Sequence, residues 1–222
     1  MAGAPVVPSG GAGLRRPPGR ILPVAFYARD TIRVARDLLG CLLCRREEDG
    51  SYTVGRIVET EAYQGEEDPA CHAAAGRTPR TRVLYGPPGR AYVYFTYGMH
   101  HCLNVVTERE GMPAAVLLRA LRPEGGLRRM THRRQGRAPR DLTRDPARLC
   151  EALAIDLHLN DTSLRGPVLG IRTDGTRPTR IACGPRVGIR VGTDRLWRFW
   201  VEGDPFVSRG SRPAPSNGSR RG

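Results

Sequence analysis

Apolar and polar residues alternate with a period of two in several stretches of this chain, the pattern of strands with one buried face. TVGRIVETEAY (53–63) shows this alternation, and AAVLLRALRP (114–123) is a further predicted strand that carries Arg119 inside an apolar run. The aromatic and β-branched segment RAYVYFTYGMHHCLNVVT (90–107) has Gly98 at its middle, which predicts two strands joined by a tight turn or bulge.

The C-terminal part of the chain predicts two closing strands, RVGIRVG (186–192) and LWRFWVEG (196–203). Beyond them, residues 209–222 are poor in core-forming side chains, as are residues 1–20, which are rich in Gly, Pro and Ala. We expect both ends to be disordered tails. The pattern between them is continuous and contains no repeat, so residues 21–208 are expected to form one domain.

Helical spacing of apolar residues is found in two segments. DTIRVARDLLGCLLCRR (30–46) begins with Asp30 as an N-cap, and its part from Leu42 onward fits a helix or a strand equally well. DPARLCEALAI (145–155) predicts a short helix capped by Asp145. Because strands cluster without regular βαβ alternation, the predicted fold class is α+β: a single domain with a curved, mostly antiparallel sheet flanked by helices.

The charge of the chain changes this picture by indicating a partner. The formal net charge is +14 and the isoelectric point is near 10.6, which predicts a polyanionic partner, first of all nucleic acid. An anionic membrane surface is the second candidate, but no apolar run is long enough to span a bilayer, and no membrane partner is expected. The arginines near the N-terminus follow its weakly apolar part, the wrong order for a secretory signal, so the expected location is the cytoplasm, with nucleoid association if the source is bacterial.

Cofactor and metal markers are absent from the sequence. There is no GxGxxG and no GxxxxGK[ST] motif, and the CLLC segment (41–44) has no second CxxC, which is typical of two small core residues. The six cysteines are expected to be reduced thiols. A metal hydrolase that uses His72, His100, His101 and nearby acids is a third alternative, but no HExxH or HxxxH spacing supports it. We therefore expect no cofactor and no metal.

The segment RIVETEAYQG (56–65) places two carboxylates inside a predicted strand. On a regular strand, side chains two positions apart share a face. One face would then carry Ile57, Glu59, Glu61 and Tyr63, and the other Val58, Thr60 and Ala62. A half-buried carboxylate can pair with arginine, bind a metal or act as a general base, and spacing alone leaves these three uses open.

The segments that follow supply further candidate groups. His72 lies in a loop-like stretch that also holds Arg77, Arg80 and Arg82, which are candidate phosphate contacts, although solvated loop arginines fit the pattern too. In the next predicted strand Tyr92 and Tyr94 share a face, which fits either core packing or stacking on bases. Tyr97 precedes Gly98, where a turn could lift it off the surface as a wedge into DNA.

These segments together resemble a known family. RIVETEAYQGEEDPACH, YVYFTYGMHHCLNVV, AVLLRAL and the closing RVGIRV…WRFWVEGDPFVS are similar to the motifs of the alkyladenine (3-methyladenine) DNA glycosylases, in the same order. The likeness runs from about Leu22 to Ser208. It implies an enzyme that flips alkylated or deaminated purines out of double-stranded DNA and hydrolyses their N-glycosidic bond, which starts base excision repair.

The resemblance also implies roles for single residues. Glu61 matches the general base that activates water for attack at C1′, Arg119 matches an arginine that helps hold this water, and Glu59 is left as structural or supporting. Tyr97 matches the tyrosine inserted through the minor groove. The residues that match the pocket for the flipped purine are Tyr63, His72 and Tyr94, which sandwich and hydrogen-bond it, and Asn104, which helps to reject guanine. At the start of the helix after Arg119, Asp145 stands where the family usually has glycine, and an acid there could repel phosphate.

The sequence contains no lysine, so all 36 of its Lys and Arg positions are arginine. Glycosylases that also cut the strand form a Schiff base through an amine. We therefore expect a monofunctional enzyme, acting as a monomer, that leaves an intact abasic site. The main alternative is a non-catalytic, arginine-rich nucleic-acid-binding protein in which the glutamates only pair with arginines.

Overall fold

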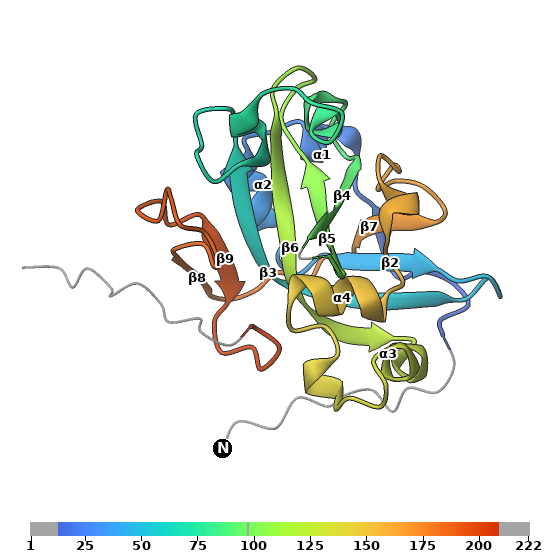
Figure 1. Ribbon diagram of the computed structural model, residues 1–222. Helices are drawn as coiled ribbons and strands as arrows, with labels where there is room; N and C mark the ends of the chain where they lie inside the picture. The colour runs from blue at the N-terminus through green and yellow to red at the C-terminus, as the bar shows by residue number, and fades with distance from the viewer. Residues whose placement is uncertain (1–12, 97, 209–222) are drawn as a thin grey trace, which may run out of the picture.

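Two long antiparallel strands, β3 (Tyr52–Gln64) and β6 (Ala114–Gly125), run through the centre of the fold (Figure 1). The structure is a computed structural model that describes residues 13–96 and 98–208. β3 and β6 are rich in apolar and β-branched residues and are buried along most of their length, as the alternating pattern predicts for the centre of a sheet. Almost every element of the candidate site either belongs to these two strands or packs beside them.

Among the described residues the sheet has nine strands, and every recorded pair is antiparallel. The order along the main path is β1-β7-β2-β3-β6-β5-β4, and β9 pairs both with β3 and with β8. The other strands are β1 (Arg20–Ile21), β2 (Leu42–Arg46), β4 (Ala91–Thr96), β5 (His100–Val106), β7 (Leu169–Thr173), β8 (Ile181–Gly184) and β9 (Arg198–Val201). β4 and β5 form the hairpin predicted around Gly98, and β2 resolves the ambiguous segment after Leu42 as a strand.

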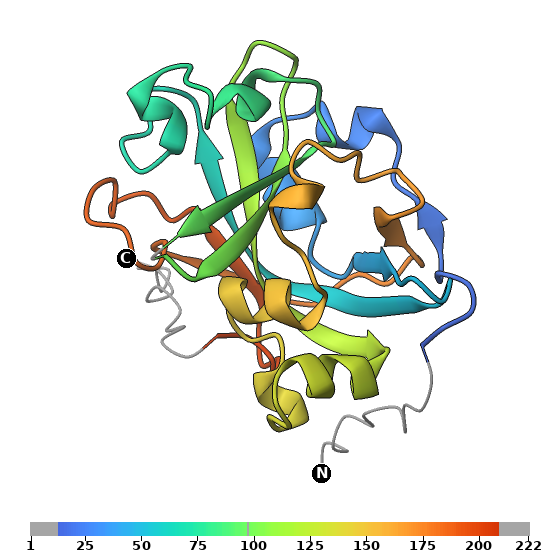
Figure 2. The same cartoon turned by 45° about the vertical axis from the view of Figure 1, so that its right-hand side comes forward.

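Short helices fill the connections (Figure 2). They are α1 (Val24–Tyr27), α2 (Thr31–Asp37), α3 (Leu127–Arg133) and α4 (Pro146–Ala152), with 3-10 turns η1 (His72–Ala75), η2 (Arg82–Tyr85), η3 (Pro139–Asp141) and η4 (Leu157–Leu159). α2 packs on β3, β6 and β9, whereas α4 packs on β5, β6 and α3. Both predicted caps are present: Asp30 accepts the Arg33 N–H at 2.8 Å, and Asp145 accepts the Ala147 N–H at 2.9 Å. The α+β fold with a mostly antiparallel sheet is thus confirmed.

One predicted strand is wrong. Residues 186–192 form no strand but a loop between β8 and β9. The backbone has positive φ at Gly188 (77°) and Gly192 (65°), a conformation that glycine adopts without steric cost but that breaks an extended strand. A half-buried strand would have buried its valines and exposed its arginines. Here Arg186 is buried, whereas Val187 and Val191 are exposed.

β3 is interrupted by an irregularity at the position of the candidate acids. Its register against β6 shifts between Ile57 and Glu59, and again directly after Glu59. Ile57 therefore packs in the same apolar cluster as Ala62, whereas Val58 packs with Trp200 in a different cluster. The predicted faces are wrong for Ile57 and Val58, because a bulge changes which side each residue occupies.

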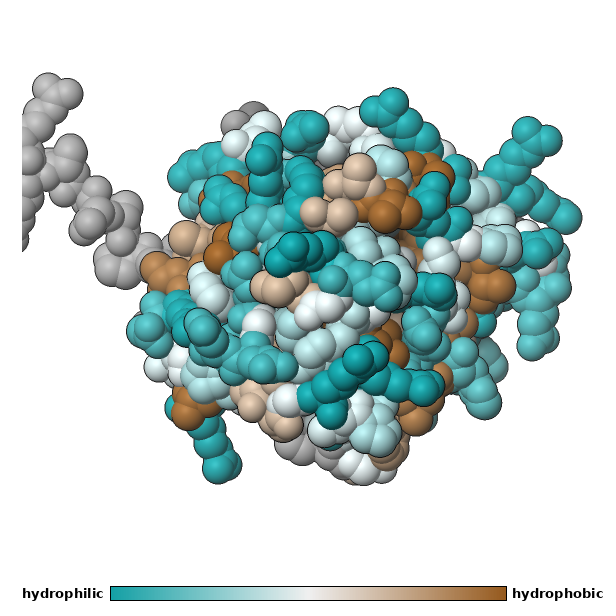
Figure 3. Space-filling model, turned by 90° about the horizontal axis from the view of Figure 1, so that it is seen from above, coloured by the Kyte–Doolittle hydropathy of each residue, from teal (hydrophilic) through white to brown (hydrophobic). Residues whose placement is uncertain are grey.

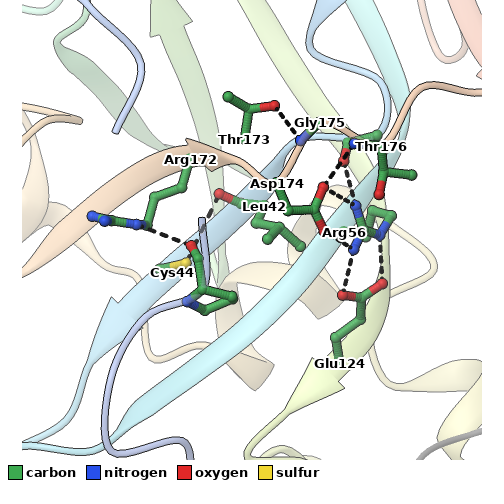
Figure 4. A network of polar contacts seen from close by, with 11 residues as sticks. Leu42, Cys44, Arg56, Glu124, Arg172, Thr173, Asp174, Gly175 and Thr176 are labelled. Carbon is green, nitrogen blue, oxygen red and sulfur yellow. Dashed lines mark hydrogen bonds and ion pairs between the residues drawn. The ribbon is translucent and has the colours of Figure 1, made fainter. Parts of the chain in front are cut away.

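Arg56 ties three segments together on the part of β3 before this irregularity (Figure 4). Its guanidinium contacts Glu124 on β6, Asp174 in the loop after β7, and the carbonyl oxygen of Gly40 before β2. The Arg56 side chain is only 11% exposed. These contacts hold the end of the long strands against their neighbours, as expected for a bidentate arginine in a partly buried network.

The described part of the chain begins within the segment that we expected to be a tail. Leu14 exchanges both backbone hydrogen bonds with Tyr52, at 3.2 and 2.7 Å, and β1 pairs with β7. The remainder of the two expected tails, residues 1–12 and 209–222, lies outside the described residues. Within residues 13–96 and 98–208, none of the helices has the length and apolar character needed to cross a bilayer.

Candidate active site

A cavity of about 750 Å³ lies between the central strands and α4, within the range of about 300–1,000 Å³ typical of ligand sites. Its walls are built by β3, β4, β5 and β6, the η1 turn, the start of α4 and the loop 187–189. Five residues that the sequence analysis predicted for the site line this cavity: Tyr63, His72, Tyr94, Asn104 and Arg119. They come from segments far apart in the sequence that the sheet brings to one place.

Glu61 lies directly behind this wall and is fully buried. Its Oε1 accepts the backbone N–H of Val187 at 2.7 Å and lies 3.3 Å from Nη1 of Arg119. Its Oε2 accepts the Tyr63 hydroxyl at 2.8 Å. Val187, Arg119 and Tyr63 all line the cavity. Because an ionised carboxylate has about four acceptor positions, these three contacts leave one on Oε2 for a further donor, as far as residues 13–96 and 98–208 show.

Glu59 has a different environment from Glu61. It accepts hydrogen bonds from Arg119 Nε at 3.0 Å, from Arg198 Nε at 2.8 Å, and from the backbone N–H and hydroxyl of Ser208 at 2.8 and 2.9 Å. Three of these donors reach Oε1 and the backbone N–H of Ser208 reaches Oε2, and of the donor residues only Arg119 lines the cavity. These contacts hold β3, β6, β9 and the segment after β9 together.

Arg119 links the two carboxylates from the neighbouring strand. It is 6% exposed and contacts Glu59 through Nε and Glu61 through Nη1. Burial alone would lower the pKa of its guanidinium, but Glu61 and Glu59 outweigh burial and raise it. A fixed, permanently charged donor thus stays beside Glu61.

Aromatic rings form another wall of the cavity. The ring centroids of His72 and Tyr94 are 4.5 Å apart in an edge contact, and those of Tyr92 and Tyr94 are 5.6 Å apart. Nδ1 of His72 lies 2.9 Å from the Tyr92 hydroxyl, which fixes the plane of the imidazole. Tyr63 packs against the same cluster. The shared face predicted for Tyr92 and Tyr94 is therefore confirmed, and both line the cavity.

The titratable groups of this wall are held in their neutral forms. Burial, with a smaller contribution from Arg80, lowers the pKa of His72 from 6.5 to about 4. Burial and then the charge of Glu61 raise the pKa of Tyr63 well above its ordinary value, and burial does the same for Tyr94. At neutral pH the wall consequently presents an uncharged imidazole and protonated phenols, so Tyr63 keeps donating its hydrogen bond to Glu61.

Asn104 lies on β5 and lines the cavity. It is 4% exposed, and its Nδ2 donates to the carbonyl oxygen of Tyr92 at 3.1 Å. That contact fixes the direction of the amide, since one of its two N–H groups is already used. The side chain is thus a rigid part of the pocket wall.

The three candidate phosphate contacts are exposed, and one of them lies beside a ring of the cavity wall. Arg77, Arg80 and Arg82 are exposed on the segment that contains η1 and η2. The Arg80 guanidinium lies 5.4 Å from the ring centroid of Tyr94, which places a positive charge beside the aromatic wall. Figure 3, which views the molecule from the upper side of Figure 1, shows hydrophilic residues over most of that face and only small separate groups of hydrophobic ones. Tyr97, the predicted wedge between β4 and β5, lies outside the described residues.

Sequence reasoning missed the contribution of the loop 186–192. Its predicted strand would have placed Val187 in the sheet, but in the loop the Val187 N–H instead reaches Glu61. The signal that could have revealed a loop was the pair of glycines at 188 and 192. Asp145 was predicted as the cap of α4, and in the structure it also lines the cavity.

Metal ligands do not gather at this site. In residues 13–96 and 98–208 no group of three or more His, Cys, Asp or Glu side chains is arranged to hold a metal ion. Cys41 and Cys44 of the CLLC segment are both buried and belong to separate apolar clusters. The chemistry available to the described residues is therefore that of a buried carboxylate, a fixed arginine and an aromatic pocket.

Comparison with known proteins agrees with this arrangement. The sequence profile of the family described as methylpurine-DNA glycosylase matches residues 25–205. Curated relatives bear the name "Putative 3-methyladenine DNA glycosylase". The one from Carboxydothermus hydrogenoformans is 48% identical over 191 residues, covering 85% of this chain and 99% of the relative. That from Methanoculleus marisnigri is 50% identical over 193 residues, covering 85% and 98%. The chain therefore belongs to the methylpurine-DNA glycosylase family.

Proposed function

We propose that the protein is a monofunctional DNA glycosylase that flips alkylated or deaminated purines out of double-stranded DNA and hydrolyses their N-glycosidic bond. The observation that carries the proposal is the position of Glu61. This carboxylate lies behind a cavity walled by aromatic rings, beside a buried arginine, and keeps one acceptor position open. An acid that served only as a salt-bridge partner would be enclosed as Glu59 is.

The chemistry follows from this position. A water hydrogen-bonded to the open position of Oε2 attacks C1′ of the flipped nucleotide while Glu61 takes its proton. The bond between C1′ and the purine nitrogen breaks, and the bonding electrons leave with the base. Positive charge develops on the sugar in the transition state, and the nearby carboxylate stabilises it. Arg119, whose Nη1 lies 3.3 Å from Glu61, is a donor on the cavity wall and helps to hold the water.

The aromatic wall fits the base that leaves. Alkylated adenine carries a positive charge, and the faces of Tyr63 and Tyr94 attract a cation through their π electrons. His72 is neutral at physiological pH, so it does not repel that charge. Asn104 is held rigidly enough to exclude a purine with an extra exocyclic amine. Tyr97 would fill the gap that the flipped base leaves in the duplex.

The charge of the chain and its rim arginines suit the DNA backbone. Arg77, Arg80 and Arg82 are exposed, and Arg80 lies beside the Tyr94 ring of the cavity wall, so their guanidinium groups can contact phosphates near the flipped nucleotide. Removing a base from the duplex costs a few kcal/mol, least for a damaged base, and these contacts help to offset that cost. Nothing in this binding mode needs a second copy of the chain, and we propose a monomer.

The absence of lysine from the sequence supports the monofunctional assignment. Strand cleavage through a Schiff base needs an amine that attacks C1′, and no lysine is present to provide it. The product is then an abasic site in an intact strand.

The test is a product analysis with the wild-type protein in the presence of EDTA. Duplexes that contain 3-methyladenine, 7-methylguanine, ethenoadenine or hypoxanthine are incubated with excess protein, and free base and strand breaks are quantified separately. The proposal predicts release of at least one of these bases, strand breaks only after treatment with hot alkali, and no covalent adduct on borohydride reduction. A borohydride-trapped adduct would refute the monofunctional assignment. Binding without release from any lesion would instead favour the non-catalytic binding protein.

A further inference from the structure

A buried ion pair next to the site joins the loop 186–192 to the segment that follows strand β3. Nη1 and Nη2 of Arg186 contact Oδ2 and Oδ1 of Asp68 at 2.5 and 2.8 Å. Both side chains are completely buried. Burial alone would raise the pKa of Asp68, but the contacts with Arg186 outweigh burial and lower it, so the pair is ionised. Neither residue lines the cavity, and the reaction proposed above does not use either of them.

Arg186 also holds the segment that carries the proposed base. Its Nη1 donates to the carbonyl oxygen of Ala62, the residue between Glu61 and Tyr63, at 3.0 Å. Its guanidinium lies 4.6 Å from the ring centroid of Tyr63, within the distance of a cation–π contact. The Arg186 side chain therefore holds both the backbone at Ala62 and the ring of Tyr63. Tyr63 in turn donates its hydroxyl to Glu61.

The position of Val187 depends on the same side chain. Val187 directly follows Arg186, and its N–H donates to Oε1 of Glu61 at 2.7 Å. The loop has no strand partner of its own, and Val187 is 38% exposed, so packing of its own side chain does not define the loop backbone. The buried guanidinium is the anchor one residue away, and its Nη2 also reaches the carbonyl oxygen of Gly192 at the other end of the loop, at 3.4 Å.

We propose that Asp68 and Arg186 are positioning residues for Glu61: their ion pair sets the Val187 N–H and the Tyr63 hydroxyl on the two oxygens of the carboxylate, and so aims its remaining acceptor position at the cavity. Asp68 orients the guanidinium through two parallel hydrogen bonds, an arrangement that lysine cannot reproduce. Neither residue touches the substrate or the water. The inference rests on the glycosylase activity proposed above.

The test uses single-turnover base release from a duplex with an alkylated purine, together with the dissociation constant for a duplex with an abasic-site analogue. Arg186→Lys and Asp68→Asn are compared with wild type. We expect the rate constant to fall at least tenfold and the dissociation constant to change less than twofold, because the positioning residues act on the chemical step. The matched control is Arg56→Lys, which makes the same change in a partly buried ion pair on β3 away from the cavity and should leave the rate constant within twofold.

A second variant covers the case in which a single replacement prevents folding. Asp68→Asn combined with Arg186→Met removes both charges of the completely buried pair, and the asparagine oxygen can still accept one of the N–H groups of Gln64 and Ala70, which donate to different oxygens of Asp68. Arg195, the other cation near Asp68, is 30% exposed and so remains in contact with water. Near-ultraviolet circular dichroism confirms the folded state before the rates are measured. This double variant should show the same loss of rate as Arg186→Lys.

Combination with Glu61→Gln separates positioning from a general structural role. If the pair acts through Glu61, adding Arg186→Lys to Glu61→Gln lowers the residual release no further. The inference is overturned if the rate constant of Arg186→Lys is unchanged, if DNA affinity falls as much as the rate does, or if the full loss persists in the Glu61→Gln background. If Glu61→Gln releases no measurable base, the comparison of rate with affinity in the single variants decides. Failure of the wild-type protein to release any base would instead refute the proposed function.

Discussion

The neutral state of His72 predicts a specific dependence of stability on pH. Its pKa is lowered from 6.5 to about 4 by burial and by Arg80, so the folded protein binds this proton less readily than the unfolded chain. The stabilising contribution of the neutral imidazole is complete above about pH 6.5, and it is lost as the pH falls toward 4. A shift of about 2.5 pKa units corresponds to about 3.4 kcal/mol. Because His72 keeps part of its surface in water, we expect about 2 kcal/mol of this to be measurable.

The measurement is urea unfolding of the wild-type protein and of His72→Gln from pH 8 to pH 4. Glutamine can still hydrogen-bond the Tyr92 hydroxyl but does not titrate, and the other titrating groups are common to both proteins. The difference between the two free energies of unfolding should be constant above pH 6.5, and the wild type should lose about 2 kcal/mol relative to the variant on going from pH 6.5 to 4. Parallel curves over the whole range, or an NMR titration that places the pKa of His72 at 6.5 or above, would refute the reasoning.

Three further predictions concern the groups around the site. Arg119→Gln should lower the free energy of unfolding by about 3–5 kcal/mol, because Glu59 and Glu61 lose the buried cation that they share; a loss below about 1 kcal/mol in urea unfolding would contradict this. Tyr63→Phe removes the hydroxyl donor to Glu61 and should cost about 1.5–3 kcal/mol, since the bond is to a charged group; unchanged thermal and urea unfolding would argue against that bond. Arg56→Ala should cost about 3 kcal/mol without slowing base release by the folded protein, and a parallel loss of release would show that the two regions are coupled.

Much of the sheet could be predicted from the sequence because its strands obey the period of two. The hairpin around Gly98 and the strand that carries Arg119 were predicted for that reason, as were the two helices capped by Asp30 and Asp145. The segment 186–192 has the same apolar spacing, yet it is a loop. Its alternation was misleading because Arg186 is buried by an ion pair with Asp68 instead of being solvated. A local pattern cannot show where such a distant partner will be.

The two acids of β3 show the same limit within the site. Spacing placed Glu59 and Glu61 on one face, and both do contact Arg119. Only the structure separates them, because the other partners of Glu59, Arg198 and Ser208, lie 139 and 149 residues further along the chain. The bulge that moves Ile57 to the face of Ala62 also has no local sequence signal. The family resemblance identified Glu61 as the base, and its contacts with Tyr63, Val187 and Arg119, which all line the cavity, supply a physical reason for that choice.

The central claim is that Glu61, and not Glu59, activates the water. The most direct measurement is single-turnover release of an alkylated purine from a duplex in EDTA, with Glu61→Gln compared with Glu59→Gln in folded protein. General-base catalysis contributes about 10²–10⁴ in rate, so Glu61→Gln should bind the duplex as wild type does and release the base at least about 100-fold more slowly. Glu59→Gln should lower stability but, through the shared Arg119, slow release by no more than about tenfold. Undiminished release by Glu61→Gln, or a larger loss for Glu59→Gln than for Glu61→Gln, would contradict the account.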